Sequence, residues 1–220
     1  LTKKQRHKLR VQQVRRQKIF LTCLFLLIVG CILLRFSKFS GRQKETHQIN
    51  AACEAYRDEV SSEAAQYDMS DYVDLILAVM MQESSGQGTD PMQSSEGAYN
   101  TRYPQQPNGI TDPSYSISCG IQELKYALEK AVCTGPTDLS KIRLALQAYN
   151  FGADSYFAYL EENGQTVWTA QSAQAFAQMA SGGTQRDEDD PLHDPAGPWD
   201  YGDQYYPDHV LRYYHLDNNS

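Results

Sequence analysis

The sequence predicts a mainly α-helical protein, and three observations lead to this prediction. Apolar residues recur at helical spacing in several separate segments. No segment of any length shows the alternation of apolar and polar residues that is typical of a half-buried strand. Polar loops rich in Gly and Pro separate the apolar segments. About 140 to 175 residues follow an N-terminal apolar run, which is enough for one domain with a single core.

The N-terminal part is strongly basic. Residues 1–44 hold 12 of the 20 Lys and Arg and no Asp or Glu. They contain an uncharged apolar run, Ile19 to Leu34, that is roughly 24 Å long as a helix and suits a short membrane span. Because positive charge before a span keeps that end in the cytoplasm, we predict a single-pass membrane protein. Its parts are a basic cytoplasmic tail (1–18), a transmembrane signal anchor (19–36), a stem (37–45) and an extracellular domain (46–220).

Two other interpretations of the apolar run stay open. A cleaved signal peptide needs a cleavage site of small residues, and none is obvious after Leu34. Ile28 to Cys31 is similar to a bacterial lipoprotein cleavage box, which would place a lipid on Cys31. The apolar run continues past Cys31, however, where a mature lipoprotein usually turns polar. An uncleaved anchor is therefore the preferred interpretation.

The predicted extracellular part is strongly acidic. Residues 45–220 carry eight Lys and Arg against all 27 Asp and Glu, a formal net charge of −19. Such a surface repels phosphate, so nucleic acid is not expected as a partner. Cys119 and Cys133 either close a disulfide loop of about 14 residues or remain buried free thiols. No spacing predicts a zinc site, and we expect no metal or cofactor.

Helices are expected at seven places after the stem. Residues 51–66 are rich in Ala and Glu without Gly or Pro, Asp71 is placed to cap the next helix, and the later segments show apolar stripes. The expected helices are 51–66, 71–82, 117–132, 142–149, 155–162, 169–180 and 208–216. The long polar segment 84–116 is expected to form a wall of a cleft. Residues 183–208, acidic and rich in Gly and Pro, are expected to be a surface excursion whose later part docks.

Glu83 is the leading catalytic candidate. It follows Met80, Val79 and Ile76 by three, four and seven residues, so it continues their apolar stripe. A carboxyl beside apolar side chains is poorly solvated, which raises its pKa and keeps it protonated near neutral pH. Glycoside cleavage needs a protonated carboxyl as its general acid. The alternative is an ordinary exposed Glu near the C-terminal end of a helix.

Several short motifs follow one another in a recognisable order: 82–86 (QESSG), 90–96 (DPMQSSE), 112–120 (DPSYSISCG), 148–152 (AYNFG) and 209–214 (HVLRYY). Each motif alone is weak evidence. The ordered set resembles the lysozyme-like domain of the CwlT-type cell-wall hydrolases carried by conjugative transposons of Gram-positive bacteria. It is more distantly similar to goose-type lysozymes and soluble lytic transglycosylases. The resemblance covers about residues 56–214 and implies a lysozyme-like helical domain.

The resemblance also implies roles for particular residues. Glu83 would protonate the oxygen of the β-1,4 bond between N-acetylmuramic acid and N-acetylglucosamine. The matching segments further imply substrate contacts from Gln93, Ser94, Gly120, Tyr149 and Asn150. Tyr149 could instead fill the core, and Asn150 could simply end a helix.

The fate of the sugar after bond cleavage is left open by the sequence. Hydrolysis with two carboxylates needs a partner for Glu83, and the candidates in the polar segment are Asp90, Glu96 and Asp112. If none reaches the site, the muramic acid 6-hydroxyl can attack instead and give a 1,6-anhydro product, as in lytic transglycosylases. Hydrolysis is preferred because the resemblance to the CwlT-type domain is the closer one.

As a whole, the sequence predicts a membrane-anchored enzyme that cuts glycan strands and opens the cell wall locally for conjugation, with conjugation-channel proteins as further partners. The competing hypothesis is a non-catalytic module that binds glycan within a secretion channel. Proteins of the CwlT type usually continue into a cysteine peptidase domain. No Cys–His pair for such a peptidase is evident here, which fits either a single-domain relative or a piece of a longer protein.

Overall fold

The computed structural model describes residues 47–190 and 193–216. Contacts divide the chain into two units, and all described residues belong to the second, His47–Ser220. The predicted cytoplasmic tail, anchor and stem (1–18, 19–36 and 37–45) lie outside the described residues. None of the described helices is long and apolar enough to cross a membrane.

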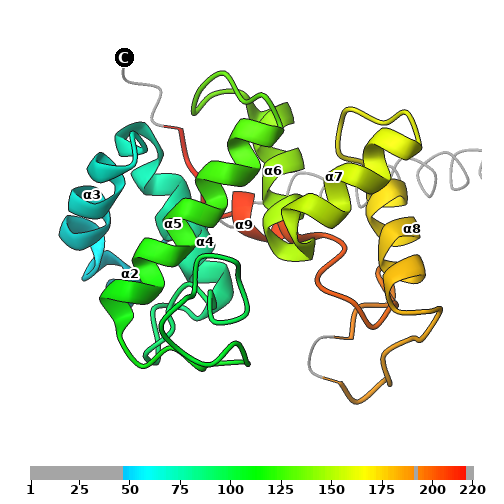
Figure 1. Ribbon diagram of the computed structural model, residues 1–220, viewed down its shortest axis with the longest axis horizontal. Helices are drawn as coiled ribbons and strands as arrows, with labels where there is room; N and C mark the ends of the chain where they lie inside the picture. Colours follow the sequence, from blue (N-terminus) through cyan, green and yellow to red (C-terminus); the bar gives the residue numbers. More distant parts are fainter. Residues whose placement is uncertain (1–46, 191–192, 217–220) are drawn as a thin grey trace, which may run out of the picture. The chain divides into compact units, whose positions relative to one another are not determined.

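The described residues form helices joined by loops, which confirms the prediction of a mainly α protein (Figure 1). Within this part of the chain no β-sheet occurs, and an isolated bridge joins Gln185 and Trp199. The helices in chain order are α2 (Ala51–Glu54), α3 (Arg57–Gln66), the 3-10 helix η1 (Ser70–Tyr72), α4 (Val73–Glu83), α5 (Pro113–Lys130), α6 (Leu139–Phe151), α7 (Ala153–Glu162), α8 (Ala170–Ala180) and α9 (Tyr206–Leu211).

Helix α4 lies at the centre of the core and ends at Glu83. All side chains from Leu75 to Met80 are fully buried, so the middle of α4 is enclosed on every face, while Asp74 near its start stays exposed. Helices α2, α3 and α9 pack against it. Because apolar burial is the main favourable term in folding, α4 gives the site a rigid base.

The N-terminal end of α4 differs from the prediction. Asp71 does not cap a regular helix, because the 3-10 turn η1 precedes α4 and the helix begins only at Val73. Such tight turns are frequent at helix ends. Asp74 instead forms an ion pair with Arg57 at 2.7 Å, and this pair joins α4 to α3.

The predicted helix 51–66 is also interrupted, and α2 and α3 are separate helices. Helix α2 is fixed beside the end of α4. The side chain of Asn50 caps α2 by accepting a hydrogen bond from the Cys53 N–H, and its amide donates to the carbonyl of Ser85 at 2.9 Å. This pair of bonds holds the chain that leaves Glu83 against the first helix.

Helix α5 ends before the predicted stripe does. The Cys133 N–H donates to the Leu128 carbonyl, and the Val132 N–H donates to the Glu129 carbonyl. These two bonds form a Schellman motif, which puts Val132 in a left-handed conformation with φ +56°. Val132, the last residue of the predicted helix 117–132 and of its apolar stripe, is consequently outside α5 and 70% exposed, so the prediction is wrong for this residue.

The described cysteines, Cys53, Cys119 and Cys133, are free thiols. The structure therefore has the second of the two predicted alternatives, and no disulfide links Cys119 to Cys133. Burial is the main cause that raises the pKa of Cys53 to about 11, so this thiol stays protonated and unreactive at neutral pH.

Helix α9 is short and is placed by its neighbours. It covers six residues, Tyr206–Leu211, instead of the predicted 208–216, and it packs against α4 and α6 (Figure 1). The sequence predicts that Val210, Leu211 and Tyr214 face inward; Val210 is fully buried and Tyr214 nearly so, while Leu211 is only partly buried. The position of α9 brings the C-terminal residues next to the end of α4, although the two segments are far apart in sequence.

Gly120 is the point at which α5 meets the loop that follows α4. A Cβ atom built on Gly120 would lie 2.6 Å from Cβ of Met92, which is closer than real contacts allow. Both residues are fully buried. Gly120 therefore permits close packing of the protein on itself, and this departs from the expectation that it lets backbone approach the substrate.

We expect Gly120→Ala to lower the free energy of unfolding by about 1 kcal/mol, because overpacking costs about 2 kcal/mol in the middle of its usual range and the gain in helix propensity offsets roughly 1 kcal/mol. Urea unfolding measures this difference. Gly135→Ala is the matched control, since a Cβ there meets nothing within 4 Å. An unchanged or higher stability of Gly120→Ala would contradict the packing argument.

Candidate active site

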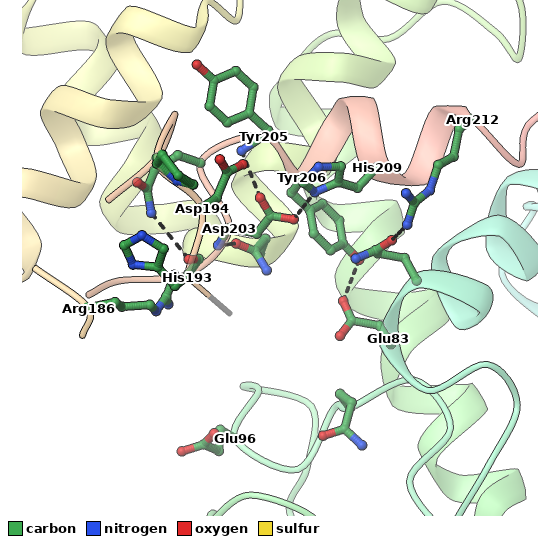
Figure 2. Close-up of a pocket in the computed structure, with 17 residues that line it drawn as sticks. Glu83, Glu96, Arg186, His193, Asp194, Asp203, Tyr205, Tyr206, His209 and Arg212 are labelled. Carbon is green, nitrogen blue, oxygen red and sulfur yellow. Dashed lines mark hydrogen bonds and ion pairs between the residues drawn. The ribbon is translucent and has the colours of Figure 1, made fainter. Parts of the chain in front are cut away.

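The carboxyl group of Glu83 lies where the end of α4 meets α9. The hydroxyl of Tyr206 donates a hydrogen bond to Oε1 of Glu83 (Figure 2). Burial is the largest cause that raises the pKa of Glu83 to about 7, against an ordinary value of 4.5. The hydrogen bond from Tyr206 opposes this rise, and the negative charges of Asp203 and Asp90 add to it. Glu83 is therefore substantially protonated near neutral pH.

Tyr206 was missed by the sequence analysis. It is 2% exposed, begins α9 and stacks on Tyr149 with ring centroids 6.3 Å apart. Tyr149 in turn donates a hydrogen bond to the Met92 carbonyl at 3.0 Å. Tyr206 and Glu83 are 123 residues apart in sequence, so no local spacing reveals their contact. Only the packing of α9 on α4 brings them together.

Asp90 holds the loop after α4 in shape. Its buried carboxylate accepts hydrogen bonds from the backbone of Ser94 and Ser95 at 3.0 and 3.2 Å, from the Ser116 hydroxyl at 2.6 Å, and from the Ser95 hydroxyl. These bonds occupy both carboxylate oxygens. Asp90 is absent from the lining of the cavities beside Glu83. The structure thus gives this candidate partner carboxylate a role in loop folding.

The other two candidate carboxylates lie in different surroundings. Asp112 caps α5, accepting from the backbone of Ser114 and Tyr115, and it does not line the cavities. Glu96 is exposed and lines the cavities on both sides of Glu83 (Figure 2). Among the three acids named from the sequence, Glu96 alone shares this space with Glu83.

The predicted substrate-contact residues separate into two groups. Gln93 and Asn150 line the cavities together with Glu83. The amide of Gln93 donates to the Asp90 carbonyl at 2.9 Å and to Oδ1 of Asn108 at 3.0 Å. Tyr149 lines one cavity. Ser94 and Gly120 line neither, because Ser94 is buried against the Ser116 carbonyl and Gly120 is packed under Met92.

Asn150 fixes the later part of the excursion. Its Oδ1 accepts a hydrogen bond from the backbone N–H of Asp203 at 2.7 Å, and Gln147 of the same helix donates to the Asp203 carbonyl at 2.8 Å. The Tyr201 hydroxyl donates to the Phe151 carbonyl at 3.0 Å. These bonds tie residues 201–203 to α6, so the excursion forms a wall of the site.

The space around Glu83 is a cleft with two halves. One cavity of about 660 Å³, here called the α9 half, has among its lining Arg186, His193, Asp203, His209 and Arg212. The other, of about 630 Å³ and here called the α7 half, has among its lining Tyr99, Glu123, Tyr126, Asp154 and Tyr201. The two halves share Glu83, Gln93, Glu96, Asn150 and Gly202. Glu83 therefore lies where an extended substrate would cross from one half to the other.

Glu123 is a second buried carboxyl that the sequence analysis missed. Burial is the main cause that raises its pKa to about 7, and Oε1 has no hydrogen-bond partner among the described residues. A Cβ on Gly97 would overlap this oxygen, so the turn at Gly97 sits directly against Glu123. The residues three and seven positions before Glu123 are Gly120 and Ser116, which form no apolar stripe, so the spacing argument that singled out Glu83 does not find it.

Asp203 and His209 form a pair within the α9 half (Figure 2). Oδ2 of Asp203 lies 2.6 Å from Nδ1 of His209. This hydrogen bond is the largest cause that raises the pKa of His209, and burial opposes it. Among the described residues, no group of three or more His, Cys, Asp or Glu is arranged to hold a metal ion.

Comparison with known proteins identifies the family. Residues 51–214 match the family model described as Lysozyme-like. The chain therefore belongs to the lysozyme-like family, which confirms the resemblance to the CwlT-type domain.

Individual relatives agree with this assignment. The bifunctional muramidase/DL-endopeptidase CwlT of Bacillus subtilis is 35% identical over 77% of this chain and 44% of its own length. The uncharacterized membrane protein YocA of Bacillus subtilis is 40% identical over 50% of this chain and 45% of its own length. The chain spans about half the length of these relatives. A Staphylococcus aureus crystal structure, described as similar to lipoprotein, NLP/P60 family, has a TM-score of 0.65 at 27% identity, covering 79% of this chain and 56% of that one.

We expect Tyr206→Phe to move the pKa of Glu83 above about 7. The substitution removes a hydrogen bond that favours the ionised carboxyl, and bonds to charged groups are worth about 1.5–3 kcal/mol. Carbon-13 NMR titration of labelled Glu side chains measures the change. Tyr156→Phe is the control, because this buried tyrosine contacts Ser172 and not Glu83. A pKa that falls or stays constant in Tyr206→Phe would contradict the proposed effect of the phenol.

Proposed function

We propose that this protein cleaves the β-1,4 bond between N-acetylmuramic acid and N-acetylglucosamine in peptidoglycan, with Glu83 as the general acid. The observation that carries the proposal is the position of Glu83, at the meeting point of two cleft halves, with a pKa of about 7. A carboxyl that keeps its proton near neutral pH can donate it to a leaving oxygen. Membership of the lysozyme-like family and the muramidase name of one relative support the same reaction.

The hydrogen bond from Tyr206 assigns different tasks to the two oxygens of Glu83. Oε1 accepts from the phenol, which leaves Oε2 to carry the proton toward the glycosidic oxygen. Tyr206 is itself held by its stacking on Tyr149, so the carboxyl is fixed before substrate arrives. Such preorganisation avoids the cost of orienting the acid during the reaction.

Hydrolysis is the preferred outcome of bond cleavage. Glu96, Asp194 and Asp203 share the α9 half with Glu83. Asp203 is engaged with the Tyr205 N–H and with His209, so the exposed Glu96, which lines both halves, is the carboxylate best placed to activate a water molecule. Asp203 also interacts electrostatically with Glu83, because its charge helps to raise the pKa of Glu83. A pair of carboxyl groups with separated pKa values is the usual arrangement for acid and base in glycoside hydrolysis.

Transglycosylation is the second candidate, and it has its own supporting observation. Asp90 and Asp112, two of the three acids that sequence nominated as partners, are engaged in folding the loop and capping α5. Without a carboxylate to activate water, the muramic acid 6-hydroxyl attacks the sugar and forms a 1,6-anhydro ring. Both reactions use Glu83 as the acid, so the identity of the product distinguishes them.

We expect purified residues 46–220 to release muropeptides from peptidoglycan, and Glu83→Gln to reduce release by at least about 10²-fold, the usual loss for a missing general acid. Mass spectrometry without prior reduction identifies the product. Ordinary reducing ends establish a muramidase, and products lighter by one water establish a lytic transglycosylase. Glu162→Gln is a matched control on an exposed face of α7. No release by the unaltered protein would favour a non-catalytic glycan-binding module instead.

We further propose that residues 19–36 anchor the enzyme in the membrane of a Gram-positive cell, with the N-terminus in the cytoplasm, and that it opens the wall locally for a conjugation channel. The net charge of −19 over residues 45–220 gives no attraction to an anionic wall. Tethering beneath the wall raises the effective concentration of the enzyme at its substrate and confines cutting to one place.

The role of the anchor is tested by comparing the full chain with the fragment 46–220 secreted at a matched level. We expect the full chain alone to restore conjugation to a strain that lacks the gene. A Glu83→Gln full chain, present at the same level, controls for effects of the membrane segment alone. Equal restoration by the fragment would show that local confinement is unnecessary.

A further inference from the structure

The two halves of the cleft differ in charge. Every Lys, Arg or His side chain that lines the cleft belongs to the α9 half: Arg186, His193, His209 and Arg212. The α7 half is lined by acids and tyrosines and has no basic residue. Residues 45–220 carry only eight Lys and Arg, and two of them line the α9 half. Four acids line each half, so the two halves differ in the presence of cations and not in the number of acids.

Arg212 is the most accessible of these cations. Its side chain is exposed, lies 4.8 Å from the ring centroid of Tyr213, and donates one hydrogen bond from Nη2 to Oε1 of Gln82 at 3.0 Å. Gln82 directly precedes Glu83 at the C-terminal end of α4, so this bond holds the guanidinium at that end of the helix, where it lines the α9 half (Figure 2). No carboxylate of the described residues forms an ion pair with Arg212. A guanidinium has five N–H donors, so several remain for a ligand.

His209 adds to the same surface. It precedes Arg212, the residue that caps the C-terminal end of α9, by three positions, which puts both side chains on one side of the helix end. The positive charge of Arg212 opposes protonation of His209, which shows that the two groups are near each other, yet the Asp203 carboxylate outweighs it. Nδ1 is occupied by Asp203 at 2.6 Å, so the remaining ring nitrogen is the one free to meet a ligand.

We propose that the α9 half binds a carboxylate of the peptide stem carried by the muramic acid residue, with Arg212 as the side chain that recognises it. This inference rests on the proposed function. In a peptidoglycan strand the sugars are uncharged once the lactyl group is joined to the stem by an amide bond. The anions nearest the scissile bond are therefore the stem carboxylates, and guanidinium–carboxylate pairing is the favoured match for them.

The inference also sets the direction of the strand. The muramic acid residue at the scissile bond lies toward the α9 half, and the uncharged N-acetylglucosamine lies toward the α7 half, where Tyr99, Tyr126 and Tyr201 offer rings for stacking. The opposite direction would put the stem carboxylates in the α7 half, where Glu123 and Asp154 line the wall and no Lys, Arg or His side chain offers a partner. Arg212 is thus a specificity-determining residue for strands that carry stems.

The experiment changes the enzyme and the substrate in turn. The substrates are intact peptidoglycan and the same material with its carboxylates converted to methylamides by carbodiimide and methylamine. We expect conversion to lower kcat/KM of the unaltered enzyme by about fivefold, the upper range for an exposed ion pair. Arg212→Gln should show the same loss on intact peptidoglycan, retain its rate on the methylamide, and be insensitive to the conversion. Arg102→Gln is the control, an exposed arginine over a tyrosine ring outside the cleft.

A second arm measures binding without cleavage. Sedimentation of Glu83→Gln with each insoluble substrate gives its apparent affinity, and adding Arg212→Gln should remove the preference for unmodified carboxylates. If the unaltered enzyme cuts neither substrate, the proposed function fails while the binding arm still judges the inference. Equal sensitivity to conversion with and without Arg212, in cleavage or in binding, overturns the inference.

Discussion

The contact between the Glu83 carboxyl and the Tyr206 hydroxyl joins the two parts of the chain that make the site. The middle of α4 is buried because α9 covers it together with α2 and α3, and α9 in turn carries the phenol that meets the carboxyl. Burial that stabilises the fold is thus the same burial that raises the pKa of Glu83 to about 7. Stability and acid strength have one physical origin here.

Two loops form the walls of the cleft around this contact. Polar side chains hold each loop in shape by hydrogen bonds to its backbone. Asp90 collects four hydrogen bonds and shapes the loop that carries Gln93 and Glu96. Asn150 binds the backbone of Asp203 and fixes the opposite wall. Because long loops without secondary structure are costly to order, each wall depends on a buried or half-buried polar side chain that binds loop backbone: Asp90 accepts four hydrogen bonds, and Asn150 accepts one.

Helices with long apolar stripes could be predicted from the sequence. Glu83 could be predicted as the catalytic candidate because it continues the apolar stripe of α4. The prediction that the helix extends to Val132 was wrong because α5 ends in a Schellman motif. The spacing of apolar residues does not reveal such an ending. Tyr206 and Asp203 could not be predicted, since their nearness to Glu83 arises from the docking of α9. Gly120 belongs to a family motif, but the structure requires glycine at this position because Met92 packs closely against it.

The pH dependence of kcat/KM for glycan cleavage tests the role of Glu83 most directly. For the free enzyme this quantity falls as its essential acid loses its proton, so the account predicts a decline above about pH 7. The measurement requires soluble glycan fragments and buffers of constant ionic strength from pH 4 to about 9. Activity lost already near the ordinary pKa of 4.5, or constant to the alkaline end of the range, would contradict the account.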